Sequence, residues 1–300
     1  MKIGVLGLGI MGGALSANLV KAGFTVSGYD PSVDATTAFV AGGGRAVASA
    51  REVAVASEIV ITSLPSAAAL EVSIGGESGL AAAGNSRLLV VETSTLPIPI
   101  KQRARDAAAN AGMLMLDCPI SGTGAQAKNK DLSLYASGER AAYDRCIEMF
   151  KGFARSWFYL GEFGNGSKMK FVANLLVSIH NVAAAEAMVM GEQAGLSLQQ
   201  VYDVIRDGAG NSRMFDVRGP MMVAGHYEPA TMKIDIWQKD IDTITAFARS
   251  IGSPTPTFDA ASGVYAEALI KGMAKLDTAA TCRILEGRAG IERQERSWGG

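Results

Sequence analysis

A glycine-rich turn near the start of the chain constrains the fold more than any other feature of the sequence. Gly7, Gly9 and Gly12 form the pattern GxGxxG, which follows an apolar run and precedes a stretch of helical composition. A second apolar run ends at Asp30, 18 residues after Gly12. This order of strand, turn, helix and strand, closed by an acidic residue, is typical of a Rossmann-type unit that binds a dinucleotide.

Each glycine of the turn has its own expected role. Gly7 permits the tight turn, Gly9 lets the backbone approach a pyrophosphate, and Gly12 lets the helix pack on the strand. Asp30 is expected to accept hydrogen bonds from the ribose hydroxyls and to repel a 2′-phosphate, and residues 31–44 contain no Lys or Arg. The sequence therefore favours NAD over NADP. The alternative for the turn is a tight strand–helix connection that binds no ligand. Asp30 could also serve as a cap before Pro31-Ser32, a role compatible with ribose binding.

The first half of the chain alternates short apolar runs with segments of helical length, which predicts a mainly parallel sheet. The helical segment 97–111 is expected to carry Lys101, Arg103 and Arg105 on its polar side. The predicted strands are 3–6, 24–29, 59–62, 88–91, 113–116 and 132–135, with a further strand near 157–160.

The pattern changes after Gly166. Residues 167–194 contain no proline and are apolar enough to raise the question of a membrane span, but polar side chains interrupt the segment. We interpret it as a long buried helix of a soluble protein. The apolar N-terminus superficially resembles a signal peptide, although its glycines would weaken such a helix. Further helices are predicted at 197–208, 233–252, 256–272 and 277–286, with a break at Gly219-Pro220 and a frayed tail at 292–300.

These patterns predict an α/β fold with a second, helical part. Residues 1–163 form the expected Rossmann-type domain, 164–194 an interdomain helix, and 195–300 an all-α domain for substrate binding and oligomerisation. A substrate is then expected in the cleft between the domains.

The composition excludes several classes of partner. Lys plus Arg is 28 and Asp plus Glu is 29, so the net charge is −1. A chain this close to neutral lacks the basic surface that attracts nucleic acids and anionic membranes. Cys118, Cys146 and Cys282 form no CxxC, and the two histidines lie far apart. We therefore predict no disulfide framework, no metal site and a reducing, cytoplasmic location.

Two more segments carry groups that could bind a substrate or take part in catalysis. The segment DCPISGTG, residues 117–124, follows a predicted strand and offers backbone N–H groups and a hydroxyl that suit a carboxylate, although an ordinary turn explains it equally well. The segment GNGSKMKFVAN, residues 164–174, places Lys170 and Asn174 four residues apart, on one face of a helix. Burial of both on an apolar helix is costly without a partner or a task, and the alternative is that both are satisfied at a domain interface.

Together these motifs resemble those of the β-hydroxyacid dehydrogenase family, along nearly the whole chain. GLGIMG resembles the family's cofactor loop, and TSLP and ETSTLP resemble its cofactor-contact segments. DCPISGTG resembles its substrate-binding segment, and GxGxxxKxxxN resembles its catalytic segment. The Lys-Asp pair at 239–240 resembles a pair near the C-terminal end of the family pattern, whose Lys approaches the nicotinamide end of the site. The cofactor-binding residues that the resemblance implies are Gly7, Leu8, Gly9, Ile10, Met11, Gly12, Asp30, Leu64, Pro65, Thr95 and Lys239.

The resemblance also implies a reaction, which is reversible hydride transfer between a β-hydroxy acid and the nicotinamide ring. It implies that Ser121, Gly122 and Thr123 hold the substrate carboxylate, that Lys170 handles the hydroxyl proton, and that Asn174 orients Lys170 and the substrate. Ser121, Lys170 and Asn174 form the implied catalytic set. A homodimer or homotetramer is the assembly usual in this family.

Several residues depart from the family pattern and leave the substrate open. Thr123 replaces a usual Gly, Ala173 a usual Asn, Glu92 a common Asp, Lys130 a common Gly, and Arg213 a frequent aromatic residue. A 3-hydroxyisobutyrate dehydrogenase-like activity is our first prediction. The alternatives are L-threonate dehydrogenase, tartronate semialdehyde reductase, an imine reductase on the same fold, and a catalytically dead dinucleotide-binding module. Retention of Lys170 argues against the last two.

Overall fold

The computed structural model describes residues 1–292 and divides the chain into two compact units. The boundary between the units falls between Lys170 and Phe171, inside the long helix α8 (Asn165–Gln193). The tail predicted to fray, residues 292–300, lies outside the described residues except for its first residue.

The first unit is built on a parallel sheet of six strands in the order β3-β2-β1-β4-β5-β6. This sheet confirms the predicted Rossmann-type fold, and the predicted strands agree with the observed ones to within a residue at most ends. The short strand β3 is an addition to the predicted set. The strands are β1 (Lys2–Leu6), β2 (Thr25–Tyr29), β3 (Arg45–Ala46), β4 (Ile59–Thr62), β5 (Leu89–Glu92) and β6 (Leu114–Asp117).

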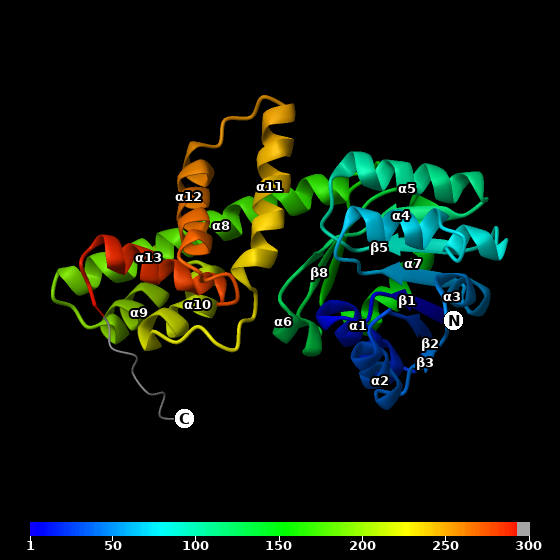
Figure 1. Cartoon of the computed structure of the whole chain (residues 1–300), viewed down its shortest axis with the longest axis horizontal. Helices are drawn as coiled ribbons and strands as arrows, with labels where there is room; N and C mark the ends of the chain where they lie inside the picture. Colours follow the sequence, from blue (N-terminus) through cyan, green and yellow to red (C-terminus); the bar gives the residue numbers. More distant parts are fainter. Residues whose placement is uncertain (293–300) are drawn as a thin grey trace. The chain divides into compact units, whose positions relative to one another are not determined.

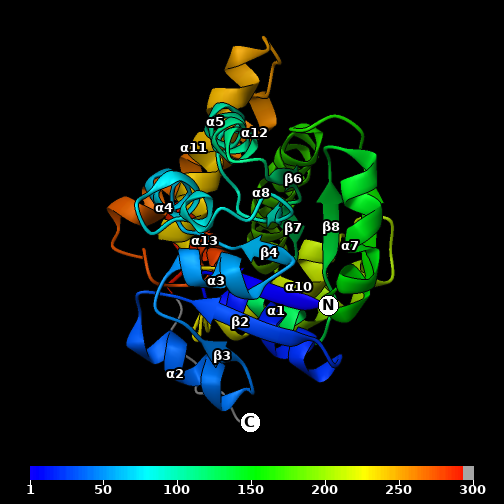
Figure 2. The same cartoon turned by 90° about the vertical axis from the view of Figure 1, so that its right-hand side faces the viewer.

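Helices cover both faces of this sheet (Figures 1 and 2). In one apolar cluster the sheet packs against α1, α2, α6 and α7, and in the other it packs against α3, α4 and α5. These helices are α1 (Ile10–Lys21), α2 (Val33–Ala41), α3 (Ala50–Ala56), α4 (Ala67–Gly75), η1 (Leu80–Ala83), α5 (Ile98–Asn110), α6 (Gly124–Lys128) and α7 (Arg140–Phe153). Burial on both faces explains why the strands are continuous apolar runs rather than alternating ones.

A second, three-stranded sheet follows the first. Its strands are β7 (Ile120–Ser121), β8 (Ser133–Ala136) and β9 (Ser156–Tyr159), with β7 and β8 antiparallel and β8 and β9 parallel. The predicted strand at 132–135 therefore belongs to a separate small sheet. This sheet brings Ser137, which follows β8, against the backbone of Asp117.

Beyond Lys170 the described chain is helical, as predicted. Its elements are the rest of α8, α9 (Leu198–Arg206), α10 (Arg213–Ala224), α11 (Ile234–Ser250), α12 (Pro256–Ile270), η2 (Thr278–Ala280) and α13 (Thr281–Arg288). Helix α8 is long and apolar enough to cross a membrane by length and composition alone. Its residues Asn174, Ser178, Asn181, Ala185 and Met188 are buried against the helical unit, as expected of a core helix.

The predicted chain break at Gly219-Pro220 is wrong, because both residues lie inside α10. A proline inside a helix leaves the carbonyl four residues earlier without its usual donor. Here the hydroxyl of Tyr202 donates to the carbonyl oxygen of Asp216, at 3.2 Å, and supplies the missing bond. A Cβ at position 219 would lie 2.5 Å from the Tyr202 ring, so glycine makes the room that this contact needs.

Candidate functional site

The glycine turn after β1 has the shape of a phosphate cradle. Gly7 has a φ of +84°, and its N–H donates to the carbonyl oxygen of Tyr29 at 3.1 Å. A Cβ on Gly12 would lie 1.8 Å from the carbonyl oxygen of Gly7, so only glycine lets α1 start this close to β1. A Cβ on Gly9 would meet nothing within 4 Å, which leaves the start of α1 open to a ligand.

Asp30 lies at the end of β2 and is tied to the glycine turn. Its Oδ2 accepts the N–H of Leu8 at 2.7 Å, and its Oδ1 accepts the N–H of Ser32 at 2.8 Å. Each carboxylate oxygen keeps a further lone pair for a hydroxyl group. The turn and Asp30 therefore fit the pyrophosphate and ribose of a dinucleotide.

The remaining cofactor candidates of the first unit follow the carboxyl ends of neighbouring strands. Leu6, Thr62, Glu92 and Asp117 form one row across the sheet, since Leu6 pairs with Thr62, Thr62 with Glu92, and Glu92 with Asp117. The segments that follow this row, which include the start of α1 and the end of β7, carry other predicted residues of the unit: Leu8, Ile10, Met11, Leu64, Pro65, Thr95, Ser121, Gly122 and Thr123. β1 and β4 are the strands where the chain reverses direction across the sheet, and ligands of such folds bind outside these strand ends.

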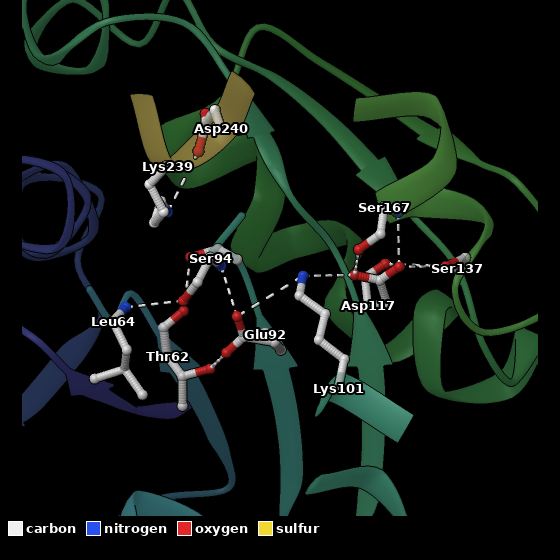
Figure 3. Close-up of polar contacts among 11 residues, drawn as sticks. Thr62, Leu64, Glu92, Ser94, Lys101, Asp117, Ser137, Ser167, Lys239 and Asp240 are labelled. Carbon is white, nitrogen blue, oxygen red and sulfur yellow. Dashed lines mark hydrogen bonds and ion pairs between the residues drawn. The ribbon is translucent and has the colours of Figure 1, made fainter. Parts of the chain in front are cut away.

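Glu92 joins two of these loops. It is fully buried, its Oε1 accepts the N–H of Ser94 at 2.7 Å, and its Oε2 accepts the hydroxyl of Thr62. The hydroxyl of Ser94 in turn accepts the N–H of Leu64 at 2.8 Å, as drawn in Figure 3. Hydrogen bonds through Ser94 thus fix the two segments expected to contact the cofactor to each other.

Asp117 joins the same edge to the start of α8. Its Oδ2 accepts the N–H of Ser167 at 2.7 Å, while its Oδ1 accepts the Ser167 hydroxyl and the Lys101 ammonium, both at 2.8 Å. The Lys101 Nζ also lies 3.8 Å from a carboxylate oxygen of Glu92. Lys101, Glu92 and Asp117 are completely buried, and Figure 3 shows Lys101 lying between the two carboxylates.

The position of Lys101 corrects a prediction made from the sequence. Its charged neighbours Arg103 and Arg105 place it on the polar side of the predicted helix, but it shares the buried face of α5 with Ala104 and Ala108. The spacing of three and four residues between these positions is the signal that could have revealed it.

Two glycines of GxGxxxKxxxN are required by the local backbone geometry. Gly164 has a φ of +97°, which favours glycine just before α8. A Cβ on Gly166 would lie 2.2 Å from the carbonyl oxygen of Tyr135 and 2.7 Å from that of Asp117. Helix α8 therefore starts in direct backbone contact with the strand ends.

Lys170 and Asn174 both lie on α8, Lys170 in the first unit and Asn174 in the helical unit. Lys170 is 7% exposed and is the last residue of the first unit. Asn174 is 2% exposed, and its amide donates to Oδ2 of Asp240 at 2.9 Å within the helical unit. Oδ1 of Asp240 lies 3.3 Å from the Nζ of Lys239, so Asp240 holds two predicted residues at once. The Lys-Asp motif includes Asp240, but its bond to a residue 66 positions away has no signal in the sequence.

The segment predicted to bind a carboxylate uses one of its backbone donors within the turn itself, at Thr123. Gly122 has a φ of +138°, and a Cβ there would lie 2.5 Å from the Leu132 side chain. The N–H of Thr123 donates to the side-chain oxygen of Gln126 at 2.9 Å, in a capping box that starts α6. Its backbone donor is therefore already engaged, which leaves Ser121 and Gly122 as the donors of this turn.

The three cysteines are buried and form no disulfide. Burial raises the pKa of Cys118 well above its usual value and that of Cys146 to about 12, so both are protonated thiols at neutral pH. Among residues 1–292, no three His, Cys, Asp or Glu side chains gather in a way that could hold a metal ion.

Comparison with known proteins places these features in one family. The model of the NAD-binding domain of 6-phosphogluconate dehydrogenase matches residues 2–161. The model described as NAD-binding of NADP-dependent 3-hydroxyisobutyrate dehydrogenase matches residues 164–285. The chain belongs to the β-hydroxyacid dehydrogenase family. This confirms the resemblance seen in the motifs and makes the chain an NAD(P)-binding oxidoreductase of the type that acts on β-hydroxy acids.

Individual relatives cover almost the whole chain. An L-threonate dehydrogenase from Cupriavidus necator is 34% identical over 95% of this chain and 96% of its own length. The crystal structure of a 3-hydroxyisobutyrate dehydrogenase from Salmonella typhimurium is 30% identical, with a TM-score of 0.84 over 95% of this chain and 99% of that one. A 3-hydroxyisobutyrate dehydrogenase from Mycobacterium tuberculosis, solved with L-serine, is 28% identical with the same TM-score over 95% of this chain and 98% of that one.

Proposed function

We propose that this family member is an NAD-dependent dehydrogenase of a small β-hydroxy acid, in which Lys170 exchanges the hydroxyl proton. The observation that carries the proposal is the nearly complete burial of Lys170, which follows the anchored start of α8 in the same unit as the dinucleotide cradle. A bound nicotinamide supplies the acceptor or donor of the hydride. Lys170 accepts the hydroxyl proton during oxidation and returns it during reduction.

The other predicted residues bind and orient. Ser121 and Gly122 donate to the substrate carboxylate, and Thr123 joins them only by releasing Gln126. Asn174 positions the substrate while Asp240 holds its amide. The residues that contact the cofactor are those of the glycine turn, with Leu64, Pro65, Thr95 and Lys239.

The preference for NAD rests on Asp30. A carboxylate that already accepts the N–H groups of Leu8 and Ser32 is fixed at the end of β2, where a ribose 2′-phosphate would meet its charge. We expect turnover with NAD to exceed turnover with NADP. Asp30→Asn combined with Pro31→Arg removes the repulsion and adds a phosphate partner, so it should shift the preference toward NADP.

Two compounds are candidates for the substrate. A 3-hydroxyisobutyrate-like acid is favoured by the two solved dehydrogenases of that name. L-Threonate is favoured by five relatives named L-threonate dehydrogenase, which are 31–34% identical to this chain. Both compounds present a carboxylate and a nearby hydroxyl group, which the same residues can bind.

The deciding experiment assays the purified protein with NAD and NADP against 3-hydroxyisobutyrate, L-threonate and L-serine, and with tartronate semialdehyde in the reductive direction. Formation or consumption of reduced cofactor is followed by absorbance. We expect NAD-dependent turnover of one acid and loss of activity on its methyl ester, which is uncharged and cannot form the charged hydrogen bonds of a carboxylate. A protein that binds NAD but turns over no hydroxy acid would instead be a dinucleotide-binding module.

The assembly and location are further proposals. Val172, Leu176 and Met190 are exposed apolar side chains on α8, and we propose that a homodimer or homotetramer covers such surface. Light scattering of the purified protein tests this directly. The three cysteines form no disulfide, which fits a reducing compartment such as the cytoplasm.

A further inference from the structure

We propose that Asp117 is a positioning residue for Lys170, and that the buried Lys101 and Glu92 hold it in place. The inference rests on the proposed role of Lys170 and adds the groups that set the position of its amine. Asp117 itself touches neither substrate nor cofactor in this scheme.

The first step is the anchoring of α8 by residues distant in sequence. The N–H groups at the start of a helix have no partner within the helix. Here the N–H of Ser167 donates to Asp117 at 2.7 Å, and the N–H of Gly166 donates to the hydroxyl of Ser137 at 2.9 Å. Asp117 also accepts the Ser167 hydroxyl at 2.8 Å. A carboxylate at this end of a helix is further stabilised by the helix dipole.

The second step is the short path from this anchor to Lys170. Lys170 lies three positions after Ser167, which is less than one helical turn and about 4.5 Å along the axis. Side chains of a helix lean toward its N-terminus, so we expect the Lys170 stem to lean back toward the turn that Asp117 holds. A shift of that turn displaces the amine directly.

The third step is the rigidity of the anchor. Asp117 is shielded from solvent, and the Lys101 ammonium 2.8 Å away balances its charge. Moving the carboxylate away from Lys101 would leave a buried charge unpaired, which is strongly unfavourable. Glu92, 3.8 Å from the same ammonium, ties the pair to the backbone of Ser94. The loops expected to contact the cofactor and the helix that carries Lys170 are therefore fixed to one buried cluster (Figure 3).

Asp277 provides a matched control, because it is also completely buried and also caps the start of a helical turn. It pairs with the buried Arg218 at 3.3 Å and accepts the N–H of Ala279 at 2.9 Å. It also accepts the N–H groups of Thr231 and Met232, which precede α11. No predicted site residue lies on η2, and Lys239 on α11 is seven positions beyond Met232, whereas Lys170 is three positions beyond Ser167. If burial and capping alone mattered, Asp117→Asn and Asp277→Asn would change the protein in the same way.

The test is a double-mutant cycle on turnover. Asp117→Asn is expected to lower kcat by roughly 10–100-fold, because a misplaced catalytic group costs rate, while the dissociation constant of NAD changes little. In a Lys170→Ala background the same substitution should lower kcat by less than about threefold, since the group it positions is gone. Asp277→Asn should lower the melting temperature but leave kcat of the folded enzyme within about twofold.

Equal effects of Asp117→Asn in both backgrounds, or equal kcat for Asp117→Asn and Asp277→Asn, would overturn the inference while the proposed function stands. If Asp117→Asn does not fold, Ser167→Ala carries the cycle, because it removes the hydroxyl bond to Asp117 and keeps the N–H bond. Its effect on kcat should be smaller and should likewise vanish without Lys170.

Amide hydrogen exchange supplies a readout that needs no substrate. In the NAD-bound protein, Asp117→Asn should speed exchange in peptides covering 165–172, and Asp277→Asn should leave them unchanged. Unchanged exchange in Asp117→Asn would overturn the anchoring, even if the wild-type protein oxidises no hydroxy acid and the proposed function fails.

Discussion

Asp117 in the first unit and Asp277 in the helical unit are both fully buried aspartates that pair with a buried cation and accept N–H groups at a helical start. The two differ in the helical element that each one anchors. Asp117 holds the start of α8 three positions before Lys170, whereas Asp277 holds η2, which carries no predicted site residue, and residues 231–232, seven or more positions before Lys239. A buried ion pair is therefore not in itself a sign of function, and its meaning depends on the group that the anchored element carries.

Removal of Lys101 or Arg218, the cations that pair with Asp117 and Asp277, should give the largest effects on stability. Lys101→Met leaves both Asp117 and Glu92 buried without their cation and should cost about 3–5 kcal/mol of unfolding free energy. Arg218→Met should cost less, because it leaves one buried carboxylate without its cation rather than two, and Asp277 keeps its hydrogen bonds from Thr231, Met232 and Ala279. Urea unfolding measures both. A larger loss in Arg218→Met would contradict this ranking.

Two crowded glycines offer the next contrast. Gly166→Ala would press a methyl group against the carbonyl oxygens of Tyr135 and Asp117, and Gly219→Ala would press one against the Tyr202 ring. Each should cost about 1–3 kcal/mol from overpacking. Only Gly166→Ala should also lower kcat, since it displaces the start of α8. Melting temperature and turnover, measured together, separate the two, and an equal drop in kcat for both would erase the distinction.

Acid should weaken the contribution of Asp277 to stability. Burial by itself raises the pKa of Asp277, but the Arg218 guanidinium and the hydrogen bonds from Ala279, Thr231 and Met232 together hold the pKa below its usual value. A lowered folded-state pKa contributes stability that is present above about pH 4 and is lost as the pH falls through the folded value. Asp277→Asn should therefore flatten the fall in unfolding free energy below about pH 4. An unchanged slope in that variant would assign the acid sensitivity to other groups.

The smallest effect is expected just after α6. Lys130 is the one residue other than glycine with a positive φ, +56°, within residues 1–292, and the equivalent position after α12 is Gly272 at +79°. Lys130→Gly should stabilise the protein by about 0.5–1 kcal/mol, and Gly272→Lys should destabilise it by a similar amount. Thermal unfolding tests the pair, and destabilisation by Lys130→Gly would mean that the lysine side chain makes a compensating contact.

The sequence predicts well where the chemistry is local. The glycine turn and Asp30 are recognisable because a tight turn, a helix start and an acidic strand end lie within 30 residues of one another. The fold class is predictable from the alternation of strand-like and helical segments. The sequence does not predict that β7, β8 and β9 form a sheet of their own, because a short apolar run does not reveal which strand it pairs with.

The sequence predicts poorly where partners are distant along the chain. Asp117 and Ser167 are 50 residues apart, and Lys101 lies on a helix whose charged neighbours suggest an exposed face. The prediction at Gly219-Pro220 is wrong because the group that satisfies the freed carbonyl is the Tyr202 hydroxyl on another helix. Such contacts depend on tertiary packing, which local propensity does not encode.

The most direct test of the proposed mechanism compares wild type with Lys170→Ala at saturating NAD and the best substrate, with NAD binding measured separately. We expect kcat to fall by about 10²–10⁴-fold while NAD binding is retained, because the cradle at Gly7–Gly12 and Asp30 is untouched. Lys170→Arg should not restore the rate, since a guanidinium stays charged and accepts no proton. Near wild-type turnover in Lys170→Ala would contradict the mechanism.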